Sequence, residues 1–271
     1  FDGKGGSNRR RKIFPEYKAG RKMSVRLNRH LDVSLTREDE HKMMIRQLNR
    51  VIEYLECLPL TMMNMDNIEA DDVIGYSAKH IFKDKCTIMS TDKDFLQLVD
   101  ERIQVYSPTK KLMYDEERIL NEYGINAKNF LLYRMLDGDK SDGIPGVKGV
   151  GLKTLLKIFP FLESPHKYTL DDLIKSSIPK VKQYKLCAEI IDSEEQMLMN
   201  KKLMDLDDLN ISGSSKLKIQ DIVEQPIQRM VKHKFQRMFL EDKLYTALPN
   251  LESWLHSTFN RLNQMAEKTH G

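Results

Sequence analysis

Four groups of acidic residues stand where one predicted element gives way to the next. They are Asp2; Glu69, Asp71 and Asp72; Asp92 and Asp94; and Asp139 and Asp142. Hydrolysis of a phosphodiester needs an activated water and neutralised charge at the phosphate, and two Mg²⁺ ions held by carboxylates supply both. The seven histidines are scattered without zinc spacing, so they do not compete for this role. The acids predict a site for two Mg²⁺ or Mn²⁺ ions.

Each acidic group also has a simpler structural explanation when it is taken alone. Acids in the first turn of a helix stabilise its positive end, and Asp92 could cap a helix that contains Phe95. Capping does not explain why the groups converge on adjacent strand ends, where carboxylates repel one another unless cations compensate. We therefore interpret the groups together as metal ligands.

A glycine-rich stretch, residues 143–154, follows the last acidic group. It reads Gly-Ile-Pro-Gly-Val-Lys-Gly-Val-Gly-Leu-Lys-Thr. Glycine lets the backbone approach another molecule closely, and the free amides at a helix start bind phosphate. The predicted contacts to the DNA backbone come from Gly146, Lys148, Gly149, Gly151, Lys153 and Thr154. The alternative is a tight turn between helices that needs glycine only for its φ angles.

The opening of the chain is strongly basic, although the net charge of the whole chain is only +4. From Lys4 to Arg29 there are ten Lys or Arg residues and one acid, Glu16. Cations interleaved with rings suit single-stranded nucleic acid, because cations follow the phosphates and rings stack on bases. The predicted contacts include Arg10, Arg11 and Tyr17. A solvated basic arm is the alternative.

Helices and strands alternate in the first half of the chain. Helices are expected from Thr36, over 70–81 and over 95–99, and strands over 58–65, 86–90 and 102–106. This alternation is typical of an α/β fold with a mostly parallel central sheet flanked by helices. Ligands of such sheets bind at the carboxyl ends of the strands, where the acids fall.

Only helices are expected after Tyr114, with Asp115 and Asn126 as helix caps. The predicted division is an α/β nuclease core over residues 1–135 and a helical region over residues 136–271. The three cysteines lie far apart, which indicates reduced thiols. No apolar run is long enough to cross a bilayer, so we expect a cytoplasmic protein without a membrane partner.

Five motifs resemble those of the flap endonuclease and 5′-3′ exonuclease family, in its phage and bacterial branch. That branch includes the phage RNase H type and the 5′-nuclease domain of DNA polymerase I. The motifs are Phe1-Asp2-Gly3, Phe14-Pro15-Glu16-Tyr17-Lys18-Ala19-Gly20-Arg21, Glu69-Ala70-Asp71-Asp72, Ser90-Thr91-Asp92-Lys93-Asp94 and residues 138–147. The resemblance covers most of residues 1 to about 160 and implies a PIN-like 5′-nuclease fold.

The resemblance implies roles for individual residues. The eight acids correspond to the family's metal ligands, and Lys18 and Arg21 to catalytic cations near the scissile phosphate. Those cations stand at the base of a helical arch, which here corresponds to the basic segment 3–45. The glycine-rich stretch corresponds to a helix-three-turn-helix, which holds duplex DNA and in relatives binds K⁺.

The implied function is a structure-specific 5′-nuclease of replication and repair. It would cut 5′-flap, nicked or RNA-primed duplex DNA by a two-metal-ion mechanism, as a monomer that partners a DNA polymerase or a single-strand-binding protein. The family carries a further metal-binding aspartate on a first strand, which we expect upstream of Phe1. The alternatives are a non-catalytic protein that binds branched DNA and a PIN-type ribonuclease.

Overall fold

The computed structural model describes residues 1–21, 36–207 and 211–269. These residues form two compact units, the first with residues 1–21, 64–207 and 211–216 and the second with 36–63 and 217–269. The boundary predicted at residue 135 falls inside the first unit. Side chains from both sides of that position, such as Ile103, Phe130 and Leu155, pack into one core. Residues 22–35 of the predicted basic segment lie outside the described residues.

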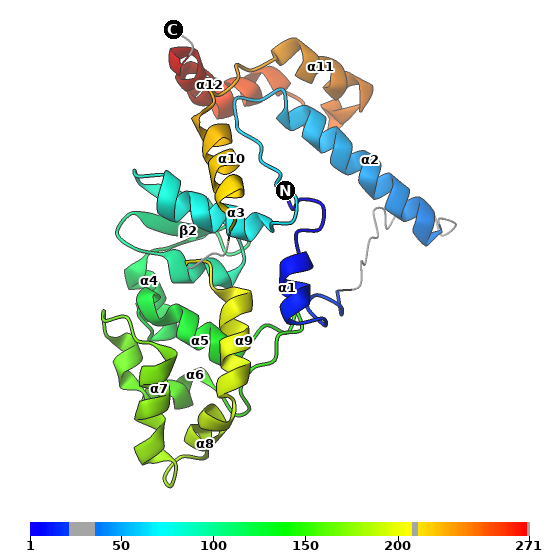
Figure 1. Ribbon diagram of the computed structural model, residues 1–271. Helices are drawn as coiled ribbons and strands as arrows, with labels where there is room; N and C mark the ends of the chain where they lie inside the picture. Colours follow the sequence, from blue (N-terminus) through cyan, green and yellow to red (C-terminus); the bar gives the residue numbers. More distant parts are fainter. Residues whose placement is uncertain (22–35, 208–210, 270–271) are drawn as a thin grey trace. The chain divides into compact units, whose positions relative to one another are not determined.

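The first unit contains a three-stranded sheet in the order β1-β2-β3 (Figure 1). Strand β1 is Cys86–Met89, β2 is Ile103–Ser107 and β3 is Leu112–Tyr114. Strands β1 and β2 are parallel, and β3 is antiparallel to β2. The strands predicted over 86–90 and 102–106 are confirmed, whereas β3 was not predicted.

The strand predicted over residues 58–65 is wrong. The described residues there form only one parallel bridge, between Asp2 and Met65. The apolar run has another cause, because Leu58 is buried in the core of the second unit against residues such as Phe235. Burial in the second unit therefore accounts for apolar residues here, which in the sequence alone resemble a strand.

Helices make up most of the rest of the first unit. They are α1 (Asn8–Ile13), α3 (Ala70–Tyr76), α4 (Glu116–Tyr123), α5 (Phe130–Asp137), α6 (Leu152–Ile158), α7 (Leu170–Ser177), α8 (Lys185–Asp192) and α9 (Glu194–Met204), with short helical turns at Lys93–Leu98, Ala127–Asn129, Pro160–Glu163 and Ile178–Lys180. The π-helix Ser77–Ile81 continues α3, so helical structure covers 70–81 as predicted. The predicted caps are confirmed, since Asp115 accepts a hydrogen bond from the amide of Arg118 and Asn126 accepts one from Lys128.

The second unit is a smaller helical assembly with its own core. It contains α2 (Arg37–Leu55), α11 (Lys232–Glu241), the turn Leu244–Thr246 and α12 (Leu251–Thr269), while α10 (Gly213–Glu224) runs through the boundary of the two units. Thr36 and Asp39 form a reciprocal capping box at the start of α2, as predicted. No helix in the described part of the chain is long and apolar enough to span a membrane.

Candidate metal and DNA site

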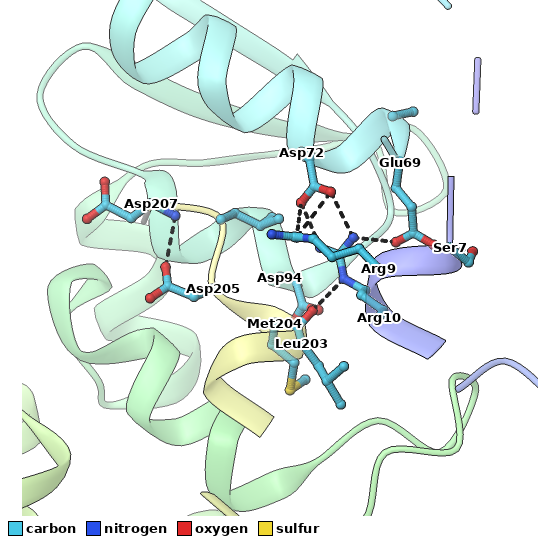
Figure 2. A network of polar contacts seen from close by, with 12 residues as sticks. Ser7, Arg9, Arg10, Glu69, Asp72, Asp94, Leu203, Met204, Asp205 and Asp207 are labelled. Atoms are coloured by element: carbon cyan, nitrogen blue, oxygen red, sulfur yellow. Dashed lines mark hydrogen bonds and ion pairs between the residues drawn. The ribbon is translucent and has the colours of Figure 1, made fainter. Parts of the chain in front are cut away.

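The group Glu69, Asp71 and Asp72 lies at the start of α3, where a buried arginine of α1 binds Glu69 and Asp72. Arg10 donates to Glu69 at 2.6 Å and to the two oxygens of Asp72 at 2.8 and 2.9 Å. Its Nε donates to the backbone oxygen of Leu203 at 2.7 Å, so all sides of the guanidinium are engaged (Figure 2). Arg10, Glu69 and Asp72 are named the Arg10 cluster below.

Further donors complete the hydrogen bonding of Glu69. Ser7, Tyr17 and Lys18 each bind its carboxylate, with Lys18 Nζ at 2.8 Å. Burial alone would raise the pKa of Glu69, but Arg10 and Lys18 outweigh it and hold the pKa below its ordinary value. Glu69 is therefore a charged, fully bonded carboxylate inside the protein.

Two of the predicted DNA contacts, Arg10 and Tyr17, are buried in this arrangement. Arg10 is 2% exposed and Tyr17 is 3% exposed, so neither side chain is placed to meet a phosphate or a base as predicted. Arg11 of the same helix is exposed. Four successive cations gave no sign of which one would turn inward. The helical geometry of α1 makes that selection.

A second buried arginine binds the other acid-bearing segments. Arg134, on α5, donates to Asp94 at 2.6 Å and to Asp139 at 2.8 Å, and also to the backbone oxygen of Gly138 at 3.1 Å. These three side chains, Arg134, Asp94 and Asp139, are named the Arg134 cluster. The sequence analysis missed Arg134. The available signal was a lone cation inside the apolar helix Phe130–Asp137, because a buried charge needs a partner.

A short hairpin fixes Asp139 and leads to Asp142. Asp139 and Ile144 exchange backbone hydrogen bonds of 2.9 and 2.8 Å, while the Asp139 carboxylate accepts from Ser141. Asp142 pairs with Arg21. The amide of Lys18, a residue with φ of 59°, donates to the Asp142 carbonyl at 2.8 Å. Both predicted catalytic cations therefore lie beside predicted metal ligands.

Apart from Asp2, whose partner is a backbone amide, Asp71 and Asp92 are the predicted acids without a bound cation in the described structure. No described residue forms an ion pair with either of them. Burial, and then the nearby charge of Asp92, raises the pKa of Asp71 to about 6. Burial also raises the pKa of Asp94 to about 7, in spite of Arg134. Burial thus disfavours the charged forms of Asp71 and Asp94, and a bound cation would offset this cost.

A cavity of about 610 Å³ opens over this region. Its walls are Arg21, Thr91, Asp92, Lys93, Arg134, Asp137, Gly138, Asp139, Lys140 and Ser141. The cavity therefore joins the loop after β1 to the hairpin after α5. Cations and acids face the same space, as a site for a phosphate and a metal ion requires.

Asp2 has a different place from the other acids. Its carboxylate accepts a hydrogen bond of 2.7 Å from the amide of Ala70, at the first residue of α3. It therefore satisfies one of the free amides of that helix. Asp2 is exposed. Because Ala70 directly follows Glu69, this hydrogen bond also places Asp2 near Glu69.

The described residues do not form a ready-made metal cluster. No three His, Cys, Asp or Glu side chains among residues 1–21, 36–207 and 211–269 are grouped so that they could hold an ion. The donor set nevertheless fits a hard divalent cation. Asp71, Asp92 and Asp94 supply oxygen atoms, the ligands that such a cation prefers.

The glycine-rich stretch separates into an inner and an outer part. A Cβ on Gly146 would lie 2.2 Å from the backbone oxygen of Asp137, so this glycine serves internal packing. Gly149, with φ of 81°, and Gly151 have no atom within 4 Å of that position. Gly151 precedes α6 directly. The outer part is thus the portion open to another molecule.

The predicted side chains of this stretch are open to solvent. Lys148, Lys153 and Thr154 are exposed. Lys148, Gly149 and Thr154 also line a cavity of about 390 Å³, together with Tyr184 and Lys185 at the start of α8. The α8 residues were not predicted, because they lie beyond the motifs.

Comparison with known proteins identifies the first half of the chain. Residues 1–124 match the family model described as the 5′-3′ exonuclease, N-terminal resolvase-like domain. The predicted family resemblance is confirmed. A 5′-3′ exonuclease of Buchnera aphidicola subsp. Acyrthosiphon pisum is 32% identical over 197 residues, which are 72% of this chain and 63% of that protein. DNA polymerase I of Bacillus subtilis is 32% identical over 58% of this chain and 18% of the polymerase.

Solved structures share the fold of this chain. The phage T5 flap endonuclease in complex with DNA and metal ions has a TM-score of 0.61 and 21% identity, over 89% of this chain and 82% of that chain. T5 5′-exonuclease with bound zinc has a TM-score of 0.61 and 22% identity, over 88% of this chain and 81% of that chain. The predicted α/β, PIN-like fold class is confirmed. The chain spans less than two thirds of the curated relatives named above.

Proposed function

We propose that this chain is a divalent-metal-dependent 5′-nuclease that hydrolyses phosphodiester bonds in 5′-flap, nicked or RNA-primed DNA during replication and repair. The observation that carries the proposal is the cavity in which Asp92 and Asp139 face Arg21. Its acids lie beside Asp71 and Asp94, whose raised pKa values favour capture of a cation. The resemblance to 5′-3′ exonucleases supports the same activity.

The acids around the cavity would hold two Mg²⁺ or Mn²⁺ ions. Asp71, Asp92, Asp94 and Asp139 are the nearest donors, with Asp142 next along the hairpin. When bound, such ions lower the pKa of a coordinated water and neutralise charge on the phosphate. Glu69 and Asp72 are held by Arg10, so in this arrangement they support the neighbouring ligands from behind.

Lys18 and Arg21 would hold the scissile phosphate. Arg21 is half exposed on the cavity wall. There its guanidinium can release Asp142 and bind a phosphate through two hydrogen bonds, as a bidentate ligand. Lys18 is mostly covered and bonded to Glu69, so it supplies a fixed positive charge beside the acids. Together these cations would orient the phosphate and hold it in that orientation until hydrolysis.

The glycine-rich stretch would hold duplex DNA away from the cleavage site. Its open glycines and exposed Lys148 and Lys153 suit contacts to the phosphate backbone, with K⁺ at the main-chain oxygens of the turn. The T5 flap endonuclease complex with DNA supports DNA as the substrate class. We also propose a cytoplasmic monomer that works with a DNA polymerase or a single-strand-binding protein.

Cleavage of a 5′-labelled flap duplex in Mg²⁺ tests the proposal. Asp92→Asn should lower the cleavage rate by more than the ~100-fold that loss of an outer-shell partner costs, while flap binding in Ca²⁺ is retained. Asp171→Asn, in an exposed pair with Lys175 on α7, is the matched control and should cleave normally. Absence of cutting by the wild-type chain in both Mg²⁺ and Mn²⁺ would refute the nuclease, and salt-dependent flap binding without cutting would indicate a non-catalytic protein. Preference for RNA would indicate a PIN-type ribonuclease.

A further inference from the structure

Helix α9 is hydrogen-bonded to the hairpin of Asp139, to the segment of Asp94 and to Arg10, although it lies beyond residues 1–124. It packs along α5 and also against α1 (Figure 1). None of its residues belongs to the five motifs or to the predicted site. The polar contacts described below nevertheless link it to the acids, two of them directly and the third through Arg10.

The first contact holds the hairpin of Asp139. Asn200, fully buried on α9, donates through Nδ2 to the backbone oxygens of Pro145 and Met135, both at 2.8 Å. Gln196, one turn earlier, donates to the same Pro145 oxygen at 3.0 Å. Pro145 follows Ile144, the residue that pairs with Asp139. The position of the hairpin therefore depends on α9.

The second contact holds the loop of Asp94. Gln97 donates through Nε2 to the backbone oxygen of Asp94 at 2.7 Å and to that of Met204 at 2.9 Å. Its Oε1 accepts from the amide of Leu206 at 3.0 Å. One side-chain amide thus ties the loop after β1 to the end of α9, using both of its polar atoms.

The third contact holds the Arg10 cluster. The backbone oxygen of Leu203, in the last turn of α9, accepts from Arg10 Nε at 2.7 Å. The end of a helix carries partial negative charge, which suits the guanidinium. Through Arg10 this contact reaches Glu69 and Asp72 at the start of α3 (Figure 2).

A buried asparagine at position 200 lowers the stability of the fold through one of its own polar atoms. Its Oδ1 is buried and has no hydrogen-bond partner among the described residues. An unsatisfied buried acceptor destabilises a protein, whereas an apolar residue of similar shape would avoid the penalty. The two carbonyls that Asn200 holds are thus the contribution that distinguishes it from leucine.

We propose that Asn200 and Gln97 are positioning residues through which α9 sets the spacing of the acid-bearing segments. They fix the hairpin of Asp139 and the loop of Asp94 to one rigid helix. This spacing then determines how tightly a divalent cation is held. The inference rests on the proposed metal-dependent function and assigns part of it to a helix outside the matched domain.

Mn²⁺ titration by calorimetry, with the full chain, tests the proposal. Asn200→Leu and Gln97→Leu should each raise the Kd for Mn²⁺ by about 10–100-fold, the range seen when supporting residues of a metal site are lost. Asn129→Leu is the matched control. Asn129 is also fully buried and donates to three backbone oxygens, those of Leu162, Ser164 and His166, none of which belongs to an acid-bearing segment of the site. It should lower stability to urea without changing the Kd more than about twofold.

The outcomes separate this inference from the proposed function. Binding of Mn²⁺ by wild type, with Kd unchanged in both leucine variants, would overturn the role of α9 alone. An equal rise in Kd for Asn129→Leu would overturn it too, because general destabilisation would then explain the effect. No Mn²⁺ binding by wild type would remove the proposed function as well. Gln196→Ala, at a less buried position, gives a folded variant in which a smaller rise in Kd is expected if Asn200→Leu fails to fold.

Discussion

Arg10 and Arg134 each bind carboxylates inside the first unit, two for Arg10 and three for Arg134 when Asp137 is included, but their partners differ in access to solvent. In the Arg10 cluster the side chains of Glu69 and Asp72 are 1% and 3% exposed. In the Arg134 cluster Asp94 and Asp139 are 18% and 22% exposed, although Arg134 itself is as buried as Arg10. The first cluster is closed on all sides, while the second opens to the cavity.

The difference separates two uses of the same ion pair. Removing one partner of a closed pair leaves a charge that water cannot reach, so the Arg10 cluster chiefly affects stability. Acids that reach a cavity can exchange an arginine for water, a proton or a metal ion. The Arg134 cluster therefore joins stability to metal binding, and the following predictions test this contrast.

The largest effect is expected for Arg10→Met. This change leaves Glu69 and Asp72 buried without their main counter-charge, and should lower the free energy of unfolding by about 3–5 kcal/mol. Urea denaturation measures it. Added Mg²⁺ should restore little of the loss. A loss below about 1 kcal/mol would show that the closed cluster is less important than its burial indicates.

Arg134→Met should have a smaller effect that depends on metal. Asp94 can take up a proton or meet water, so a loss of about 1–3 kcal/mol is expected in EDTA. Mg²⁺ should reduce this loss, because a cation at the cavity replaces the missing positive charge. The same urea titration with and without Mg²⁺ measures the difference, and a loss that Mg²⁺ leaves unchanged would remove the contrast between the clusters.

The open cluster should also give a pH dependence of stability. With the pKa of Asp71 near 6 and that of Asp94 near 7, the folded chain retains protons that the unfolded chain has lost above about pH 4. These two carboxyls should thus make the metal-free protein less stable, and lower its melting temperature, as pH rises from about 4 to about 7. Thermal melts of wild type and Asp94→Asn measure this fall.

Asp94→Asn removes one of the two titrating groups, so its fall should be shallower than that of wild type. Added Mg²⁺ should oppose the fall in wild type, because the ion binds the deprotonated carboxylates. Parallel pH profiles for wild type and the variant would contradict the assignment of the pH effect to Asp94.

The smallest effect is expected for Arg9→Ala. Arg9 is a second donor to Asp72, at 3.2 and 3.3 Å, and its side chain is 29% exposed. Loss of this partly solvated pair should cost less than about 1 kcal/mol, because Arg10 still neutralises Asp72. Urea denaturation beside Arg10→Met measures it. Comparable losses in the two variants would show that the cluster does not depend on burial.

The elements that the sequence predicted are those that depend on near neighbours. Strands β1 and β2 and the caps at Asp115 and Asn126 follow from local apolar runs and from side chains three residues or fewer from the amides they bind. Strand β3 has three residues, too few for a visible pattern. The strand predicted over residues 58–65 failed because Leu58 and Leu60, at its start, pack against a helix distant in sequence, which no local pattern contains.

The same distinction applies to the candidate site. Aspartates after strands and before helices could be found from their positions. In the structure the charge of Asp92 contributes to the raised pKa values of both Asp71 and Asp94. The choice of Arg10 over Arg11 for burial could not be found, because it depends on Leu203 and Asp72. Arg134 and Asn200 act through backbone oxygens and acids that only the folded chain brings to them.

The bond between Arg10 and Leu203 joins residues 193 positions apart. A growing chain cannot make this bond until nearly the whole first unit has left the ribosome. Until then Glu69 and Asp72 lack part of the frame that holds their arginine. Contacts of such long range also slow folding, since a large loop must close before they form. An acidic site that α9 completes would thus gain its full metal affinity only after the chain has been synthesised past Leu203.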